Sequence, residues 1–242
     1  RYPRSVDDAL NVVFDALGDD EPAIRQVLLP LAYAQGRGLP AGPLWSDLVK
    51  GLGGDRARKL DRKNLDPTFV LTHAPWLVVA DLVDGRVVYR LFHAALREHL
   101  QADRPTARMH GRIAATLARH ISSHRSDSRS SSADDYTYAL AYLSGHLRQA
   151  GFWRALGTRV TEPSWIARQT RGRLFENSRY TVDVEEAHAA ASVANVTAVD
   201  AERSPPALVP MAWRLLWRSG CVALVARIPA EGLALMVRED AL

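Results

Sequence analysis

The amino-acid sequence predicts a mainly α-helical protein with one short β-hairpin in its first half. Apolar residues recur every three or four positions over most of the chain, which is the period of a helix with one buried face. The exception is the stretch from Trp76 to Leu91, where two apolar runs flank Asp84-Gly85. An Asp-Gly pair between apolar runs indicates a tight hairpin turn, because both residue types tolerate a positive φ.

Three helices are predicted before the hairpin. Ser5 is a good N-cap for the first, Pro22 suits the first turn of the second, and Pro43 opens the third. Glycines follow each apolar stripe, so the helices are expected over 5–18, 22–36 and 43–54. The short segment from Thr68 to His73 fits either a helix or a strand. Three helices followed by a two-stranded wing is the order of a winged helix, which is the fold expected for residues 1–104.

Helices alone are predicted after the hairpin. Phe92, Leu96 and Leu100 recur at helical spacing, and a helix over 105–124 repeats an apolar residue every fourth position at Met109, Ile113, Leu117 and Ile121. Residues 125–135 are rich in serine and charge, so we expect a flexible linker there. From 136 to 242 a helical-repeat region is predicted, with a long helix from about Val182 and further pieces over 206–219 and 222–237. Helical pairs in series are typical of an α-solenoid-like array.

Composition limits the class of protein. The 242 residues are 47% hydrophobic and 24% charged, as in a globular protein. The net charge of +4 permits binding of nucleic acid but does not indicate it. Cys221 is the one cysteine, and no signal peptide or membrane-length apolar run occurs, so we expect a cytoplasmic protein without a membrane segment. Because the first methionine is Met109, a fragment of a longer protein is expected.

No catalytic motif is found, which predicts a non-enzymatic module. The chain contains neither the P-loop pattern GxxxxGK[ST] nor the serine-nucleophile pattern GxSxG. His93 and His99 are six residues apart and would face different sides of a helix, so no metal site is predicted. His110, His120 and His124 lie on or beside an arginine-rich helix, where a solvated face explains them.

Two stretches carry a resemblance to a known family. They are LLPLAYAQGRGLPAGPLW, residues 28–45, and VVYRLFHAALREHL, residues 87–100; YALAYLSGHLRQAG, residues 138–151, adds a weaker match. Together they resemble the region that follows the nucleotide-binding domain in actinobacterial signal-transduction ATPases with numerous domains (STAND), which are NACHT or NB-ARC type switch proteins. The resemblance implies an upstream P-loop ATPase domain in the same polypeptide, and helical repeats that bind protein partners.

His93 acquires a possible role from this resemblance. Phe92-His93-Ala94 occupies the place of the Met-His-Asp motif, whose histidine contacts the β-phosphate of bound ADP in related switch ATPases. An imidazole N–H can hydrogen-bond a phosphate oxygen. Ala94 replaces the aspartate of the motif, so an orienting carboxylate would have to come from elsewhere. In the other interpretation His93 only begins a helix. ATP or ADP would bind the parent protein, and no cofactor is expected in this chain itself.

DNA binding is the alternative function, because winged helices commonly bind DNA. The helix that would enter the major groove is expected to carry cations. Residues 66–74 have no lysine or arginine, and only Arg86 lies beside the turn of the hairpin. The basic residues form two other groups, at Arg56, Arg58, Lys59, Arg62 and Lys63, and at Arg104, Arg108 and Arg112. A solvated face explains both groups, so contacts with protein are favoured over contacts with DNA.

Overall fold

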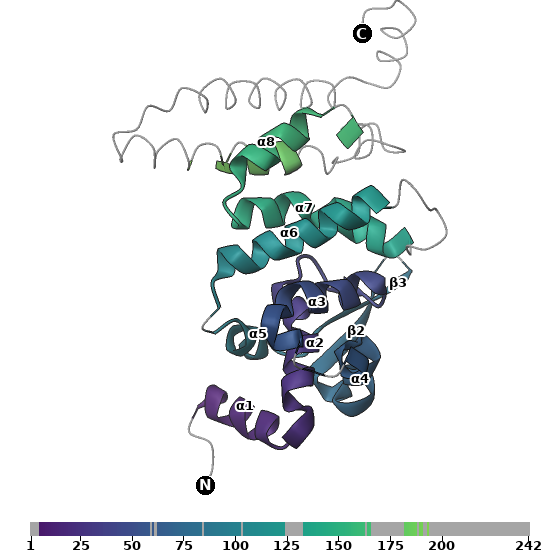
Figure 1. The fold of residues 1–242 in the computed structure, drawn as a ribbon, viewed down its shortest axis with the longest axis vertical. Helices are drawn as coiled ribbons and strands as arrows, with labels where there is room; N and C mark the ends of the chain where they lie inside the picture. The colour runs from purple at the N-terminus through teal and green to yellow at the C-terminus, as the bar shows by residue number, and fades with distance from the viewer. Residues whose placement is uncertain are drawn as a thin grey trace, which may run out of the picture. The chain divides into compact units, whose positions relative to one another are not determined.

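The structure is a computed structural model, drawn in Figure 1. It describes residues 5–58, 60, 62–83, 85–102, 104–123, 133–162, 164–165, 182–187, 189–190 and 193. The chain divides into two compact units, Arg1–Ala150 and Gly151–Leu242. The expected class is confirmed at the level of a mainly helical fold with a small antiparallel sheet. No helix in the described residues is long and apolar enough to cross a membrane.

The first unit holds seven α-helices and three strands among its described residues. The helices are α1 (Val6–Asp15), α2 (Glu21–Tyr33), α3 (Pro43–Arg58), α4 (Pro67–His73), α5 (Ala94–Gln101), α6 (Thr106–Ser123) and α7 (Ala133–Gln149). Short 3-10 turns lie at η1 (Gly18–Asp20), η2 (Arg62–Leu65) and η3 (Pro75–Leu77), and the strands are β1 (Leu39–Pro40), β2 (Val78–Val83) and β3 (Arg86–Leu91).

The sheet has a third strand that the sequence pattern does not reveal. The predicted hairpin is present, with Val78 opposite Leu91 and Val83 opposite Arg86, and Gly85 takes a φ of 76° in the turn. Strand β1 pairs with β3 on the other side, which gives the antiparallel order β1-β3-β2. Gly38 makes this pairing possible, because a Cβ atom there would collide with the backbone oxygen of Tyr89.

The core of the first unit is built around α2. Every residue of this helix from Gln26 to Tyr33 is buried, and α3 and α5 pack against it. Trp45 on α3 is fully buried and donates its indole N–H to the carbonyl oxygen of Val27, 2.9 Å away. Gln26 donates in return to the carbonyl of Val49 at 2.8 Å, so the polar groups inside the α2–α3 contact are hydrogen-bonded.

Helices α6 and α7 lie side by side against α3 (Figure 1). The predicted apolar stripe of α6 is confirmed, because Met109, Ile113, Leu117 and Ile121 are all buried. The Tyr138 hydroxyl on α7 accepts a hydrogen bond from the backbone N–H of Gln35, 3.1 Å away. The helical pair is therefore fastened to the end of α2 and forms part of the same compact unit.

Two local predictions need correction. Phe92 precedes α5 and is 45% exposed, so it is not part of the buried stripe formed by Leu96 and Leu100. Helix α7 already begins at Ala133, inside the range predicted as a linker, whereas residues 124–132 lie outside the described residues. The predicted break at the glycines of the third helix is confirmed, because Gly54 is non-helical with φ 53° and α3 is kinked there before it continues to Arg58.

The second unit contains helix α8 (Trp153–Thr161) and a short packed cluster. Trp165 is buried and donates its indole N–H to the Asp183 carboxylate at 2.9 Å. Val184 and Ala187 are buried in the predicted helix that starts near residue 182. The helices predicted over 206–219 and 222–237, and Cys221, lie outside the described residues.

Candidate functional site

His93 lies at the junction between strand β3 and helix α5, where it is exposed. It is the N-cap of α5, and its Nδ1 accepts the backbone N–H of Ala95 at 3.1 Å. An imidazole nitrogen that accepts a hydrogen bond carries no proton, so the neutral ring must be protonated at Nε2. The Nδ1 atom of His93 therefore caps α5, and Nε2–H on the other side of the ring is left as a hydrogen-bond donor. The aromatic ring of Phe92 contacts it, with 5.9 Å between ring centroids.

Four apolar side chains on and beside the hairpin that precedes His93 are exposed. Leu82 and Val87 face each other across the two strands, and both are exposed, Leu82 by 70%. Trp76 and Phe92, at the base of the hairpin, are also exposed. We call these four residues the wing surface. The pair formed by Leu82 and Val87 at the end of the hairpin is the part of this set that could be covered by a partner.

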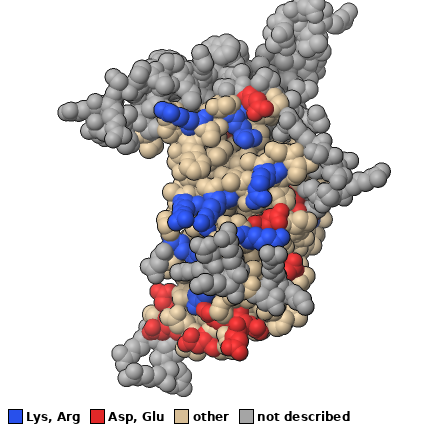
Figure 2. All heavy atoms as spheres, viewed as in Figure 1, with Lys and Arg blue, Asp and Glu red and all other residues tan. Residues whose placement is uncertain are grey.

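The cations of the hairpin are engaged with carboxylates. Arg86 forms an ion pair with Asp134 of α7 at 2.8 Å, and Arg90 pairs with Asp81 of the neighbouring strand at 2.5 Å. Acidic side chains gather over α1 and η1, where Asp7, Asp8, Asp19 and Asp20 lie (Figure 2). Neither the hairpin nor the surface over α1 and η1 therefore carries an excess of positive charge.

His110 and His120, which were predicted to be solvated, are buried instead. His110 on α6 and His146 on α7 place their Nδ1 atoms 2.8 Å apart, and His120 contacts the Asp47 carboxylate at 3.0 Å. The burial of His110 could not be predicted from the sequence, because its partner His146 lies 36 residues away and on a different helix. The predicted solvated face on α6 is therefore wrong for His110 and His120, while His124 lies outside the described residues.

At least one of the paired rings of His110 and His146 must be neutral. Two protonated rings would point N–H groups at each other, whereas in a neutral pair one Nδ1 donates and the other accepts. Burial lowers the pKa of His146 to about 3, with a further contribution from His110. Burial also lowers the pKa of His110, assisted by the charge of Arg148. The Nε2 atom of His146 is buried and has no hydrogen-bond partner in the described part of the chain.

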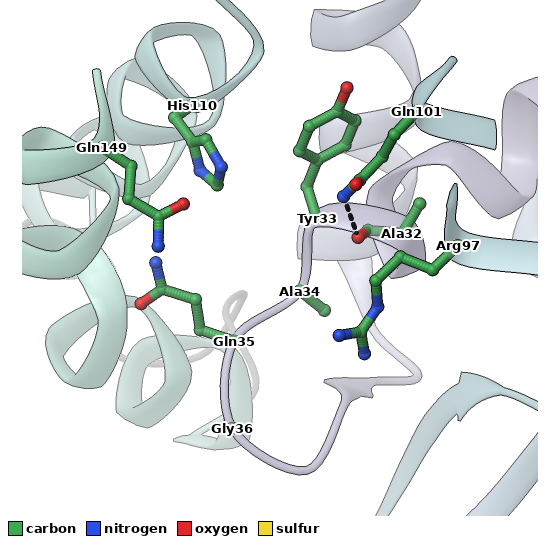
Figure 3. A pocket seen from close by; sticks show the side chains of 9 residues that line it. All are labelled: Ala32, Tyr33, Ala34, Gln35, Gly36, Arg97, Gln101, His110 and Gln149. Atoms are coloured by element: carbon green, nitrogen blue, oxygen red, sulfur yellow. Dashed lines mark hydrogen bonds between the residues drawn. The ribbon is translucent and has the colours of Figure 1, made fainter. Parts of the chain in front are cut away.

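A polar cleft of about 330 Å³ opens beside this pair, where the end of α2 meets α5, α6 and α7. Figure 3 shows its side chains, with His110, Gln149 and Gln35 on one side and Tyr33, Gln101 and Arg97 on the other. Gln101 donates to the carbonyl oxygen of Ala32 at 2.7 Å, which fixes α5 to α2. The sequence analysis missed this cleft because its walls come from segments up to 117 positions apart.

His93 and the polar cleft are the two candidate sites considered in the first unit. Among the described residues there is no group of three or more potential metal-ligating side chains. Comparison of the chain with protein-family models, with curated proteins and with solved structures finds no match.

Proposed function

We propose that this chain is a non-catalytic regulatory and protein-interaction module of a STAND-type signalling ATPase in the cytoplasm. In the intact protein it would couple the nucleotide state of an upstream ATPase domain to the binding of protein partners. Such coupling needs two conformational states that differ in their contacts with the nucleotide. A winged-helix-like first domain would contact the ATPase domain, and an α-solenoid-like array after it would bind partners.

The arrangement of the first unit supports the winged-helix part of the proposal. Helices α2, α3 and α4 precede a hairpin, and the short strand β1 joins that hairpin as its third strand. Three helices followed by a β-wing is the order of elements that a winged helix requires. The helical pair α6–α7 and helix α8 follow in the chain, as a helical array would.

The observation that carries the proposal is the state of His93. Its Nδ1 is used by the cap of α5, so a neutral ring presents Nε2–H to the outside. The backbone N–H groups in the first turn of α5 add partial positive charge at the same place. A phosphate oxygen of ADP is a suitable acceptor for this donor, and no neighbouring carboxylate is needed to fix the ring, because the cap already does so. The absence of the aspartate at Ala94 is therefore compatible with the role.

The wing surface supports a protein partner rather than a nucleic acid. Leu82, Val87 and Phe92 expose apolar area, which gains free energy when it is covered by protein. DNA binding would need uncompensated cations along the hairpin and on α4. The hairpin arginines are paired with carboxylates, and α4 has neither lysine nor arginine. The acidic surface over α1 and η1 would repel phosphates (Figure 2).

The test is the rate at which ADP leaves the intact protein, produced with its upstream ATPase domain. His93→Asn keeps a side-chain oxygen for the cap but has no ring nitrogen that reaches outward. ADP should dissociate roughly tenfold faster, which is the effect of losing one hydrogen bond to a charged group. His73→Asn, on the exposed end of α4, is the matched control. An unchanged rate in His93→Asn would rule out the nucleotide contact.

A further inference from the structure

Strand β2 forms one edge of the sheet, and every second residue of β2 directs its backbone N–H and C=O groups away from β3. In an antiparallel pair, residues that exchange hydrogen bonds with the partner strand alternate with residues that do not. The backbone N–H of Phe92 donates to the carbonyl oxygen of Leu77 at 3.2 Å, which fixes this alternation along the register of β2 and β3. The outward-facing residues of β2 are therefore Val78, Ala80 and Leu82.

The outward-facing backbone groups are accessible. Among the described residues, no hydrogen bond joins the backbone of Val78, Ala80 or Leu82 to anything outside the sheet. The side chains of Ala80 and Leu82 are exposed, so water reaches this edge. A row of free N–H and C=O groups along an exposed edge strand is a template on which another strand can pair.

The two edges of the sheet differ in how well they are protected from such pairing. Strand β1, at the other edge, has only two residues, one of which is Pro40, and α7 packs against it. A short strand, a proline and a covering helix each prevent an edge from pairing. Strand β2 has six residues without proline, lysine or glycine. Its one charged residue, Asp81, is neutralised by the ion pair with Arg90 of β3.

We propose that two copies of this chain pair through their β2 strands, antiparallel and about a two-fold axis at Ala80, so that their sheets join into one continuous sheet. In this register Ala80 lies opposite Ala80 of the second copy, and Leu82 lies opposite Val78. Each outward-facing residue then exchanges two hydrogen bonds with the residue opposite it. Two-fold dimers are the commonest oligomers. This inference does not rest on the proposed function, because β2 belongs to this chain alone.

The charges on β2 favour this register. Asp81 lies opposite Val79 of the second copy, so like charges are not opposed. If the strands slid by two residues in one direction, the two Asp81 carboxylates would lie directly opposite each other, which is destabilising. If they slid by two residues in the other direction, Leu82 would lie beyond the end of the second β2 strand. The register centred on Ala80 is therefore the one that uses the whole edge.

The apolar side chains near the two ends of β2 explain why a second copy is a suitable partner. Leu82, near the turn of the hairpin, is 70% exposed, and Trp76, just before the strand, is 58% exposed. Antiparallel pairing brings the Leu82 end of each strand to the Trp76 end of the other. Covering exposed apolar area gains free energy. Because the axis is two-fold, this contact is made twice.

The experiment is sedimentation equilibrium of the whole chain over a range of protein concentrations. A strand pair is a small interface, so the average mass should rise toward that of a dimer between about 1 µM and about 300 µM. Ala80→Lys and Ala80→Glu each place like charges opposite each other on the two-fold axis, so each variant alone should remain monomeric. An equimolar mixture of the two variants should dimerise, because opposite charges then face each other.

Val12→Lys and Val12→Glu are the matched controls. Val12 is 57% exposed on α1, outside the sheet. These variants carry the same changes of charge as the variants at Ala80, and each should dimerise as the wild-type chain does. Circular dichroism checks that all four variants are folded.

Amide hydrogen exchange of the wild-type chain provides an independent signature of strand pairing. When about nine-tenths of the chain is dimeric, the N–H groups of Ala80 and Leu82 should exchange roughly tenfold more slowly than in the monomer. The N–H groups of Asp81 and Val83 face β3 and should change little. A dimer formed through another surface would leave the exchange at Ala80 unchanged and would contradict the proposal.

Three results of the sedimentation experiment would also overturn the proposal. The first is a wild-type chain that stays monomeric over the whole range, in which case the edge of β2 could serve only a strand from another protein. The second is dimerisation of Ala80→Lys or Ala80→Glu alone to the same extent as the wild type. The third is a mixture of these two variants that stays monomeric.

Discussion

The carboxylate of Asp135, in the first turn of α7, accepts a hydrogen bond from the backbone N–H of Leu44 at the start of α3, over 3.1 Å. Both residues are fully buried. An aspartate normally caps the helix that it precedes, but here it caps a helix 91 positions earlier in the chain. The first turn of α7 is thereby anchored to the N-terminus of α3, which places the α6–α7 pair against the core.

Asp135→Ala should lower the free energy of unfolding by roughly 1–3 kcal/mol, because the buried N–H of Leu44 loses its acceptor. Chemical denaturation with urea measures the change. Asp134→Ala is the matched control, since its ion pair with Arg86 is half-exposed and is worth about 0–1 kcal/mol. Equal losses in the two variants would show that the long-range cap contributes nothing of its own.

Gly42→Ala tests the same contact from the other side. A Cβ atom at this position would lie 2.5 Å from Asp135 Oδ1, so the carboxylate would have to move away from Leu44. We expect a loss of roughly 1–3 kcal/mol in the wild-type background. In the Asp135→Ala background the same substitution should cost much less, because the obstructing carboxylate is gone. Additive losses in this double-mutant cycle would contradict the predicted coupling.

Acid should weaken the contact between α6 and α7. The folded-state pKa values of His110 and His146 are both lowered, so the unfolded chain binds more protons than the folded chain in acid. Their contribution to stability is complete above the unfolded pKa of about 6.5 and is lost as the pH falls toward the folded pKa. The free energy of unfolding should therefore decrease between pH 7.5 and pH 5, by at most about 1.4 kcal/mol per pH unit for each histidine.

The double variant His110→Leu, His146→Leu isolates this effect. It replaces both partners by apolar side chains, which avoids leaving one buried ring unpaired. Urea denaturation at several pH values should show a flatter profile for this variant than for the wild type between pH 7.5 and pH 5. His73→Leu, at an exposed position, should keep the wild-type profile. A double variant with an unchanged slope would mean that other groups cause the acid sensitivity.

Leu96→Asp and Phe92→Asp test whether these two residues differ in burial, as the structure shows, or share one buried helical stripe, as their spacing predicts. Leu96 is fully buried, so a charge there should unfold the first unit, whose margin of stability is about 5–15 kcal/mol at most. Phe92 occupies the preceding position of the same apparent stripe but is exposed, and Phe92→Asp should remain folded with a change within about 1 kcal/mol. Circular dichroism during thermal melting measures both. Unfolding by Phe92→Asp would place this residue in the core after all.

Local patterns predicted much of the fold, while long-range contacts escaped them. Ser5 as a cap and the spacing of Met109, Ile113 and Leu117 act within a few residues, so the sequence reveals them directly. Strand β1 has only two residues, and its existence depends on pairing with Tyr89, fifty positions later. No short-range signal marks such a strand, because its pairing partners, Val88 and Tyr89, are distant in the sequence.

The two candidate sites also differ in whether a local sequence pattern or long-range packing identifies them. His93 could be singled out because Phe92-His93-Ala94 resembles the Met-His-Asp motif, which is a pattern of adjacent residues. The polar cleft could not, since Tyr33, His110 and Gln149 come together only through the packing of α2, α6 and α7. The buried state of His110 was missed for the same reason: its partner, His146, lies on another helix.

The measurement that tests the central claim most directly is the sequence of the source DNA upstream of the codon for Arg1, in the same reading frame. The account predicts a P-loop of the form GxxxxGK followed by Ser or Thr, roughly 250–300 residues before Arg1, as the usual size of such a domain requires. That result would make the ADP-release test on His93→Asn decisive. A stop codon directly upstream, or a domain without a P-loop, would contradict the proposed coupling to an ATPase.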